Sequence, residues 1–268
     1  MTMPNLKNKV AIVTGSSRGI GKAIAIKLAQ SGATVVVTAR TGIPSDSSPG
    51  SLQETCEEIK NLGGSAFPIV CNVREEQSII DLVNKVTENF ETIDILVNNA
   101  GIGNYQSFTE SSLKQWDLVL DINLRAPVIM MQHVLPIMIK QQSGSIINIS
   151  SHAATNIFSS TLSSDNSDDV KLIGQSYGAS KAALERLSWG LAAELGEHNI
   201  AINVLKPLKP VVTEGFIAQR PDGDYSSWSS PDAMALATTI LAAQEKPDGF
   251  SGTIYTAEEL LSLYKNLS

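Results

Sequence analysis

Short runs of β-branched residues alternate with longer helical patterns along this chain, and that alternation restricts the fold more than any other feature. Several runs are apolar almost throughout, as is typical of strands with helices on both faces. The pattern predicts βαβ units with right-handed crossovers and therefore an α/β fold with a doubly wound parallel sheet. The predicted strands are 9–15, 34–40, 66–73, 93–101, 144–151, 200–207 and 252–257, and the predicted helices are 19–31, 51–62, 75–90, 111–141, 176–197 and 231–243.

Two stretches interrupt the alternation. Residues 155–175 are rich in Ser, Asp and Asn, and residues 206–231 carry four prolines and several aromatic residues. Loops of this length inside a compact domain are usually functional or mobile. We find no repeat and no linker long enough to divide the chain, so we expect residues 1–268 to form one domain.

The composition excludes several classes of function. The net charge is −7, and no Lys/Arg cluster occurs, so we expect no nucleic-acid and no membrane partner. The two cysteines and three histidines show no metal-ligand spacing, and we expect no metal site. The N-terminus lacks a signal-peptide pattern and no apolar run reaches about 18 residues, so we expect a cytoplasmic protein.

A glycine-rich turn follows the first predicted strand, in "VAIVTGSSRGIGKAIAIKLA". Gly15, Gly19 and Gly21 would allow a tight turn and a close approach of the backbone to a pyrophosphate at the helix N-terminus. At the first strand–helix junction of a βαβ chain, this spacing favours a dinucleotide site over a turn without a ligand. Ser17, Arg18 and Ile20 belong to the same predicted site.

The end of the second predicted strand bears on which dinucleotide binds. An NAD site usually has an acidic residue there for the ribose 2′-hydroxyl, whereas an arginine accommodates a 2′-phosphate. This strand ends in "TAR", and no acid follows before Asp46. Arg40, with Arg18 from the glycine turn, therefore favours NADP(H) over NAD(H). The alternative is that Arg40 is only a solvated charge.

A third block, "SYGASK", opens the predicted helix 176–197. Tyr177 and Lys181 are four residues apart and so share a face of the helix. Alone, such a pair is most often an ordinary surface feature. Further polar residues accompany it: "NNAG" after the fourth predicted strand, Asn123 in "DINLRAPV", and two serines that end "GSIINISS".

Taken together and in this order, these motifs resemble the short-chain dehydrogenase/reductase family from about residue 8 to about residue 207. The resemblance implies a single Rossmann-type, doubly wound, parallel seven-stranded sheet flanked by helices on both faces. It also implies NADPH-dependent, reversible reduction of a carbonyl to an alcohol. Tyr177 would be the general acid, and Lys181 would lower its pKa and bind the nicotinamide ribose. Ser151 would hydrogen-bond the carbonyl oxygen, and Asn123 would hold a water that relays protons.

The resemblance extends the cofactor site and suggests an assembly. Successive strand residues point to opposite faces, so Ser150 and Ser151 cannot both serve, and the family favours the second. We expect a small-molecule carbonyl or alcohol substrate and a homodimer or homotetramer built on helices 111–141 and 176–197. The further cofactor-binding residues implied are Asn72, Val73, Asn99, Ala100, Gly101, Pro207 and Thr213, with Tyr177 and Lys181.

The chain departs from the family pattern at several points. Ser151 and Tyr177 are 26 residues apart, about twice the usual separation, because of an insertion at 156–174. We interpret it as a mobile surface loop, and the alternative is a lid that contacts the substrate. Asn72 replaces a common Asp, Leu208 replaces a glycine, and "TAEELLSLY" replaces a glycine-rich C-terminal motif. These changes resemble a branch called hydroxysteroid-dehydrogenase-like, a name that does not indicate a steroid substrate.

Two alternatives remain open. A 3-oxoacyl-carrier-protein-type reductase would need a basic docking patch, and the sequence offers only isolated lysines such as Lys206 and Lys209. A non-catalytic NADP(H)-binding sensor or scaffold would need the glycine turn but not Tyr177. The substrate cannot be read from the fold. Residues that could line an apolar pocket are Tyr105, Phe158, Phe216, Tyr225 and Trp228.

Overall fold

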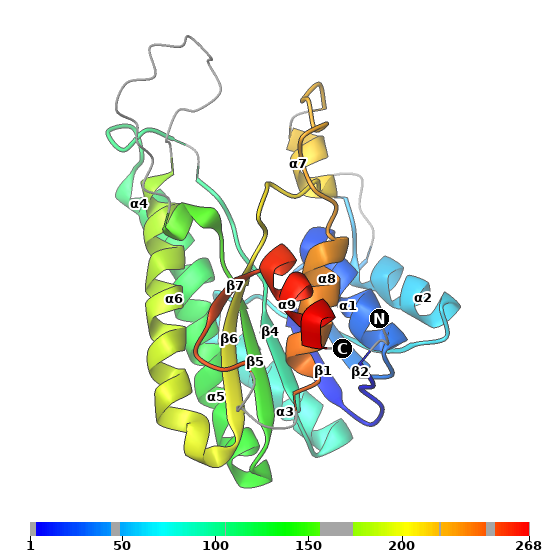
Figure 1. The fold of residues 1–268 in the computed structure, drawn as a ribbon. Helices are drawn as coiled ribbons and strands as arrows, with labels where there is room; N and C mark the ends of the chain where they lie inside the picture. The colour runs from blue at the N-terminus through cyan, green and yellow to red at the C-terminus, as the bar shows by residue number, and fades with distance from the viewer. Residues whose placement is uncertain are drawn as a thin grey trace.

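Seven parallel strands form one sheet in the order β3-β2-β1-β4-β5-β6-β7 (Figure 1). The structure is a computed structural model, and it describes residues 4–43, 49–104, 106–155, 174–219, 221–244 and 250–267. The strands are β1 (Val10–Thr14), β2 (Thr34–Ala39), β3 (Ser65–Val70), β4 (Ile95–Asn98), β5 (Gly144–Ile149), β6 (Ile200–Lys206) and β7 (Ile254–Thr256). The Rossmann-type sheet predicted from the sequence is confirmed. The insertion expected at 156–174 lies almost entirely outside the described residues.

Helices cover both faces of the sheet. Within the described part of the chain they are α1 (Gly19–Gln30), α2 (Leu52–Asn61), α3 (Glu76–Phe90), α4 (Leu113–Leu120), α5 (Ala126–Gln141), α6 (Gln175–Leu195), α7 (Glu214–Gln219), α8 (Asp232–Ala242) and α9 (Ala257–Leu267). Helices α1, α2, α8 and α9 supply one hydrophobic cluster, and α3, α5 and α6 supply the other. In Figure 1, α1, α2 and α8 lie to the right of the strands, and α5 and α6 lie to the left.

The alternation of side chains along each strand divides the core between these two layers. In β1, Ala11 and Val13 belong to the cluster under α1 and α8, whereas Val10 and Ile12 belong to the cluster under α3 and α5. Successive side chains of a strand point to opposite faces, and both faces here are covered. This is why the strands read as continuous apolar runs in the sequence.

The structure differs from the sequence prediction at two C-terminal helices. Helix α9 was not predicted, although Thr256 and Glu259 form a reciprocal cap in which each side chain bonds the other's backbone N–H, at 3.2 and 3.0 Å. A threonine followed three residues later by a glutamate is a sequence signal for a helix start. Helix α7 was also missed, because its six residues are too few to show helical periodicity.

The predicted helix 111–141 is divided. Residues Asp121–Arg125 form a π-helical turn between α4 and α5. Single π-helical turns inside longer helices often occur at functional sites. Among the described residues, the run 113–141 is the one helical segment long and apolar enough to cross a membrane, and 44% of its most apolar window is buried. A core helix that packs on a sheet meets the same criteria.

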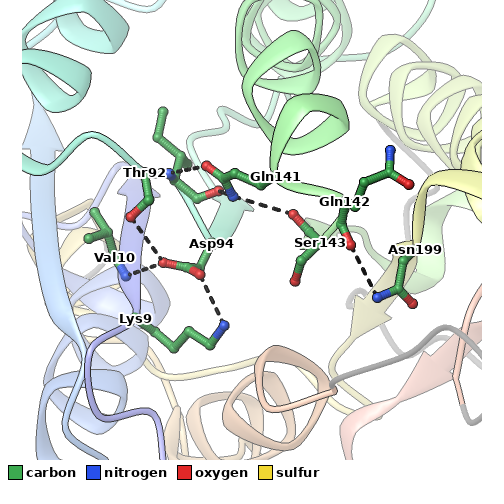
Figure 2. Close-up of polar contacts among 9 residues, drawn as sticks. Lys9, Val10, Thr92, Asp94, Gln141, Gln142, Ser143 and Asn199 are labelled. Atoms are coloured by element: carbon green, nitrogen blue, oxygen red, sulfur yellow. Dashed lines mark hydrogen bonds and ion pairs between the residues drawn. The ribbon is translucent and has the colours of Figure 1, made fainter.

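The amino-terminal edge of the sheet is held by a local network of polar contacts (Figure 2). The Asp94 carboxylate accepts hydrogen bonds from Lys9 Nζ at 3.0 Å and from the Val10 N–H at 2.9 Å. The Gln141 side chain both accepts from and donates to the Ile93 backbone, at 3.0 Å each. At this edge, hydrogen bonds between polar groups therefore connect β1, the start of β4 and the end of α5.

Candidate active site

The predicted site residues gather at the opposite, carboxyl-terminal edge of the sheet. The strand order reverses direction between β1 and β4, and ligands of open α/β sheets bind outside the strand ends at such a switch point. The glycine turn follows β1, and "NNAG" follows β4. The sequence predicted both motifs at this edge, and the topology makes them neighbours.

The glycine turn is packed so closely that side chains are excluded. Gly15 has a φ of +67°, and a Cβ there would lie 2.9 Å from the Ala100 Cα. A Cβ on Gly21 would overlap the Asn99 side chain and the Gly15 carbonyl. A positive φ and a close backbone approach are the two conditions that require glycine. The turn therefore provides the cradle that a pyrophosphate needs at the N-terminus of α1.

Thr14 ties "NNAG" to this turn. Its hydroxyl accepts hydrogen bonds from the N–H groups of Asn99 and Ala100, at 3.0 Å each, and donates to the Val97 carbonyl at 3.3 Å. The Asn99 amide donates to the Thr14 carbonyl at 2.9 Å and to the Gly15 carbonyl at 3.2 Å. Thr14 was missed as a site residue. Its position as the last residue of β1 is the signal that identifies it.

An acidic side chain already lies on the helix N-terminus. Glu214, at the start of α7, accepts a hydrogen bond from the Gly19 N–H at 2.8 Å. The neighbouring Thr213 side chain lies 3.1 Å from where a Gly19 Cβ would stand. A helix N-terminus favours negative charge, and Glu214 shows that the turn accepts an anionic oxygen here. The residues present thus fit a pyrophosphate, and Glu214 occupies part of its place.

The remaining cofactor residues lie along the same edge. Arg40 is exposed at the end of β2, and the Cys71 N–H bonds the Ala39 carbonyl at 3.0 Å, which brings Asn72 beside it. The Asn72 amide donates to Glu75 at 2.7 Å. Arg18 donates to the Pro49 carbonyl at 2.9 Å. Val73 lines a small cavity with Thr14, Asn98 and Ala100.

The second part of the site surrounds a buried ammonium. Lys181 on α6 is 3% exposed, and its Nζ donates to the Ile149 carbonyl at 2.7 Å. A Cβ on Gly101 would lie 3.6 Å from this Nζ and 3.3 Å from Asn123 Oδ1. Burial lowers the pKa of Lys181 from 10.5 to about 8, and the Glu185 carboxylate acts in the opposite direction. An ammonium that titrates near neutral pH is characteristic of functional sites.

Asn123 lies in the π-helical turn and is fully buried. Its amide donates to the Ile102 carbonyl at 2.9 Å and to Ser180 Oγ at 3.1 Å, and its oxygen accepts from the Ile102 N–H at 2.9 Å. The side chain thus joins the segment after "NNAG" to helix α6. The expected water relay through Asn123 stays a prediction.

Tyr177 lies one turn before Lys181, whose Nζ is 5.9 Å from the centre of the tyrosine ring. The glycine between them has a steric role, because a Cβ on Gly178 would lie 2.8 Å from the Ala153 carbonyl. The short helix His152–Ala154 that follows Ser151 therefore packs directly on α6. Gly178 was missed as a site residue, although it stands inside the motif "SYGASK".

The two serines at the end of β5 have different surroundings. Ser150 is 3% exposed and donates from Oγ to Glu185 at 2.7 Å. Ser151 is partly exposed, and its Oγ accepts a hydrogen bond from the Ala153 N–H at 3.2 Å. Of the two serines, Ser151 is therefore the more exposed residue. This arrangement agrees with the choice of Ser151, whose role stays a prediction.

The segment 206–231 folds over this edge and rises above the strand ends with α7 (Figure 1). Trp228 contacts Phe216 and Tyr225 with ring centres 5.1 and 5.0 Å apart. These three aromatic residues pack on one another, and Tyr105 and Phe158 lie outside the described residues. Leu208 is 48% exposed, and its N–H bonds Glu258 at 3.2 Å. Pro207 is partly buried beside it.

The structure therefore brings the predicted residues into two adjoining groups. The glycine turn, Asn99, Ala100 and Thr213 form one, and Gly101, Asn123, Ser151, Tyr177 and Lys181 form the other. Arg40, Asn72 and Pro207 lie at the same edge, outside these two groups. Within the described ranges, no three His, Cys, Asp or Glu side chains come together in a way that could hold a metal ion.

Known proteins share these features. Residues 9–221 match the family model described as short chain dehydrogenase. The chain is 36% identical over 251 residues to the 3-oxoacyl-[acyl-carrier-protein] reductase FabG of Thermotoga maritima. That alignment covers 90% of this chain and 92% of the relative. The chain is also 33% identical over 249 residues to hydroxysteroid dehydrogenase-like protein 2 of Danio rerio, in an alignment that covers 93% of this chain. The chain spans 57% of that relative's length.

A solved structure extends the similarity to three dimensions. It is that of a metagenomic short-chain oxidoreductase in complex with NADP, with 30% identity and a TM-score of 0.74. The alignment covers 94% of this chain and 97% of the other. The fold, the matched motifs and these relatives agree. The chain belongs to the short-chain dehydrogenase/reductase family of NAD(P)-dependent oxidoreductases, which act on CH–OH and C=O groups.

Proposed function

We propose that the protein uses NADPH to reduce a small carbonyl compound to an alcohol, in a reversible reaction. The observation that carries this proposal is the buried ammonium of Lys181, which lies beside Tyr177 and Gly101 and next to the glycine turn. Burying an ammonium is costly even with a carboxylate such as Glu185 nearby, so a chain without this chemistry gains nothing from keeping it there.

In the proposed reaction the bound cofactor supplies a hydride to the carbonyl carbon. Tyr177 donates a proton to the carbonyl oxygen, and Ser151 holds that oxygen by a hydrogen bond as negative charge develops. The positive charge of Lys181 favours the phenolate and so makes the Tyr177 proton easier to transfer. Lys181 has three N–H donors; one binds Ile149, and we assign another to the nicotinamide ribose. Asn123 binds Ser180, next to Lys181, and the backbone of Ile102, and so holds these two segments together. We also assign to Asn123 the water of the proton relay.

The preference for NADP(H) over NAD(H) is part of the proposal. Arg40 directly follows β2, at the position where NAD-binding proteins usually have an acid, and Arg18 occupies the N-cap position of α1. Asp46, the first acid after the strand, lies outside the described residues. The solved relative with bound NADP supports the same preference.

Reduction of a 3-oxoacyl thioester is the second candidate function. The 36% identity to the FabG reductase over nearly its whole length favours it. Of the two lysines considered for carrier-protein docking, Lys206 is 8% exposed and engaged with Thr155, so it cannot contribute to a docking surface, whereas Lys209 is exposed. A free thioester is therefore the more suitable test substrate than a carrier-bound one.

The test is a steady-state assay of cofactor absorbance against ketones, aldehydes, diketones and 3-oxoacyl thioesters, with NADPH and NADH in parallel. We expect turnover with NADPH and a kcat/KM at least tenfold lower with NADH. Arg40→Asp should reverse this preference, whereas Lys85→Asp, at an exposed position on α3, should not. Binding of NADPH without turnover across the panel would support the sensor alternative instead.

We also propose that the protein is a cytoplasmic homodimer or homotetramer that assembles through α4, α5 and α6. Large side chains are exposed there: Trp189 is 55% exposed under the Arg186 guanidinium, and Leu113 is 80% exposed. Light scattering after size exclusion should give two or four times the chain mass of 28.6 kDa. Trp189→Glu should shift the protein toward the monomer.

A further inference from the structure

Three charged side chains are almost completely buried among the described residues, and all three lie together under the candidate site. They are Lys181, Glu185 and Lys206, with 3%, 4% and 8% of their surface exposed. Glu185 follows Lys181 by one helical turn on α6, and Lys206 ends β6. Only Lys181 has a role in the proposed reaction. A buried ion pair is weak evidence for stability, and in some proteins such a pair is retained because it specifies one conformation.

Glu185 and Lys206 hold the two ends of the turn that carries Ser151. The Glu185 carboxylate accepts from Ser150 Oγ at 2.7 Å, directly before Ser151. Lys206 Nζ donates to Thr155 Oγ1 at 3.0 Å, directly after the short helix that follows Ser151. The two side chains also face each other, with Lys206 Nζ 3.5 Å from Glu185 Oε1. The pair therefore spans the whole turn and fixes it to α6 and β6.

Lys181 is held by the same strand end. Its Nζ bonds the Ile149 carbonyl, and Glu185 bonds the next residue, Ser150. Two side chains one turn apart on α6 thus bind the last residue of β5 and the residue that follows it. Any displacement of Glu185 would move the backbone that positions both the Lys181 ammonium and the Ser151 hydroxyl.

We infer that Glu185 and Lys206 are a pair of positioning residues for the proposed reaction, which hold the Ser151 turn in place and set the electrostatic field at Lys181. This inference rests on the proposed function. It concerns residues of this chain that touch neither the reacting atoms nor the glycine turn in the structure.

The charges around Lys181 explain how the pair would act. Burial lowers the pKa of Lys181 to about 8, and the Glu185 carboxylate is the nearby charge that raises it again. Lys206 offsets part of the negative charge of Glu185. Other ionisable groups on α6 and the elements packed against it are Tyr177, Arg186 and Glu194 on α6, His152 after β5, Lys114 and Asp117 on α4, Asp121 and Arg125 in the π-helical turn, and Glu197 and His198 after α6.

The two members of the pair should therefore have opposite effects. Glu185→Gln removes a negative charge and keeps an oxygen that can accept from Ser150, so the pKa of Lys181 should fall by about one unit. Lys206→Met leaves the Glu185 charge uncompensated, so the pKa of Lys181 should rise. Because Lys181 acts as the ammonium, the alkaline limb of kcat/KM should move to lower pH in the first variant and to higher pH in the second.

The experiment is an NMR titration of the lysine side chains in the full-length protein, with the Lys181 resonance assigned by Lys181→Arg, together with pH profiles of kcat and KM. The titration needs no turnover, so failure of the proposed reaction and failure of this inference can be distinguished. Asp94→Asn and Lys9→Met provide a matched control pair, because they change an ion pair with a 3.0 Å contact at the other edge of the sheet. They should lower the melting temperature and leave the Lys181 titration unchanged.

A third variant, at Glu185, tests the positioning of the Ser151 turn separately from the charge near Lys181. It also keeps the inference testable if one of the first two variants does not fold. Glu185→Asp keeps the carboxylate but draws it back from Ser150, so kcat should fall about tenfold with KM within about twofold and with the pH limb unmoved. The inference is overturned if Glu185→Gln and Lys206→Met move the Lys181 pKa in the same direction or not at all. A wild-type kcat in Glu185→Asp would overturn the positioning role.

Discussion

The two edges of the sheet are built from the same strands and differ in how their polar groups are satisfied. At the amino-terminal edge, Asp94 accepts from Lys9 and Val10, and Gln141 closes on the Ile93 backbone (Figure 2). At the carboxyl-terminal edge, an ammonium is buried with a lowered pKa, glycines allow a close backbone approach at the N-terminus of α1, and the Glu214 carboxylate from α7 lies on that N-terminus.

This difference indicates that the carboxyl-terminal edge is built for chemistry at some cost in folding stability, whereas the amino-terminal edge is not. Neutral or paired groups at the first edge cost little to bury, whereas Lys181 and the glycine turn are stable only because the surrounding packing fixes them. Substitutions at the first edge should therefore change unfolding and leave the reaction intact. Substitutions at the second edge should do the reverse.

The largest effect is expected for Tyr177→Phe. The variant keeps the ring beside Lys181 and removes the proton donor, so kcat/KM should fall by roughly 10² to 10⁴, the usual contribution of general acid catalysis. The melting temperature should stay within a degree or two of wild type. Tyr255→Phe on β7 is the control, and an activity of Tyr177→Phe close to that of this control would refute the assigned role.

Gly21→Ala should come next. The added Cβ would overlap the Asn99 side chain and the Gly15 carbonyl, which opens the turn that would bind the pyrophosphate. The Kd for NADPH, measured by fluorescence titration, should rise at least tenfold. Gly196→Ala is a suitable control, because nothing lies within 4 Å of an added Cβ there and the backbone is helical. Unchanged binding in Gly21→Ala would show that the turn does not hold the cofactor.

Asp94→Ala tests the amino-terminal edge. It leaves the Val10 N–H and the Lys9 ammonium without their acceptor, which should cost about 1–3 kcal/mol of unfolding free energy. The melting temperature should fall by roughly 2–4 °C per kcal/mol in a chain of this size. Values of kcat and KM below the transition should match wild type. A loss of activity in the folded variant would mean that the two edges are coupled.

The smallest effect is expected for Glu214→Gln. The Glu214 carboxylate binds the Gly19 N–H that a pyrophosphate would use, so neutralising it should favour the cofactor. Affinity for NADPH should increase by roughly two- to fivefold, the size of one exposed charge at a helix end. Glu88→Gln on the exposed face of α3 provides the control. Weaker NADPH binding in Glu214→Gln would show that Glu214 assists the cofactor instead of competing with it.

Much of this site could be predicted because its chemistry is local in the sequence. Tyr177 and Lys181 share a face of one helix by spacing alone, and the glycine turn is a single strand–helix junction. Helix α9 could also have been predicted, since Thr256 and Glu259 have the spacing of a capping box.

Other features depend on contacts between segments far apart in the chain. Glu214 reaches Gly19 across 195 residues, and Lys206 reaches Thr155 across 51. Glu185 has the spacing of an ordinary helix charge, and nothing in the sequence shows that it faces Ser150. Periodicity reports which face of an element a residue is on, and it does not report what packs against that face.

The sequence alone therefore determined the sheet-and-helix alternation, the glycine turn and the Tyr177–Lys181 pair, because each depends on spacing within one or two elements. Only the tertiary structure decided that Lys181, Glu185 and Lys206 are buried together and that α7 lies over the end of α1. Burial and pairing arise when separate elements pack, and the charge state of a side chain follows from that packing.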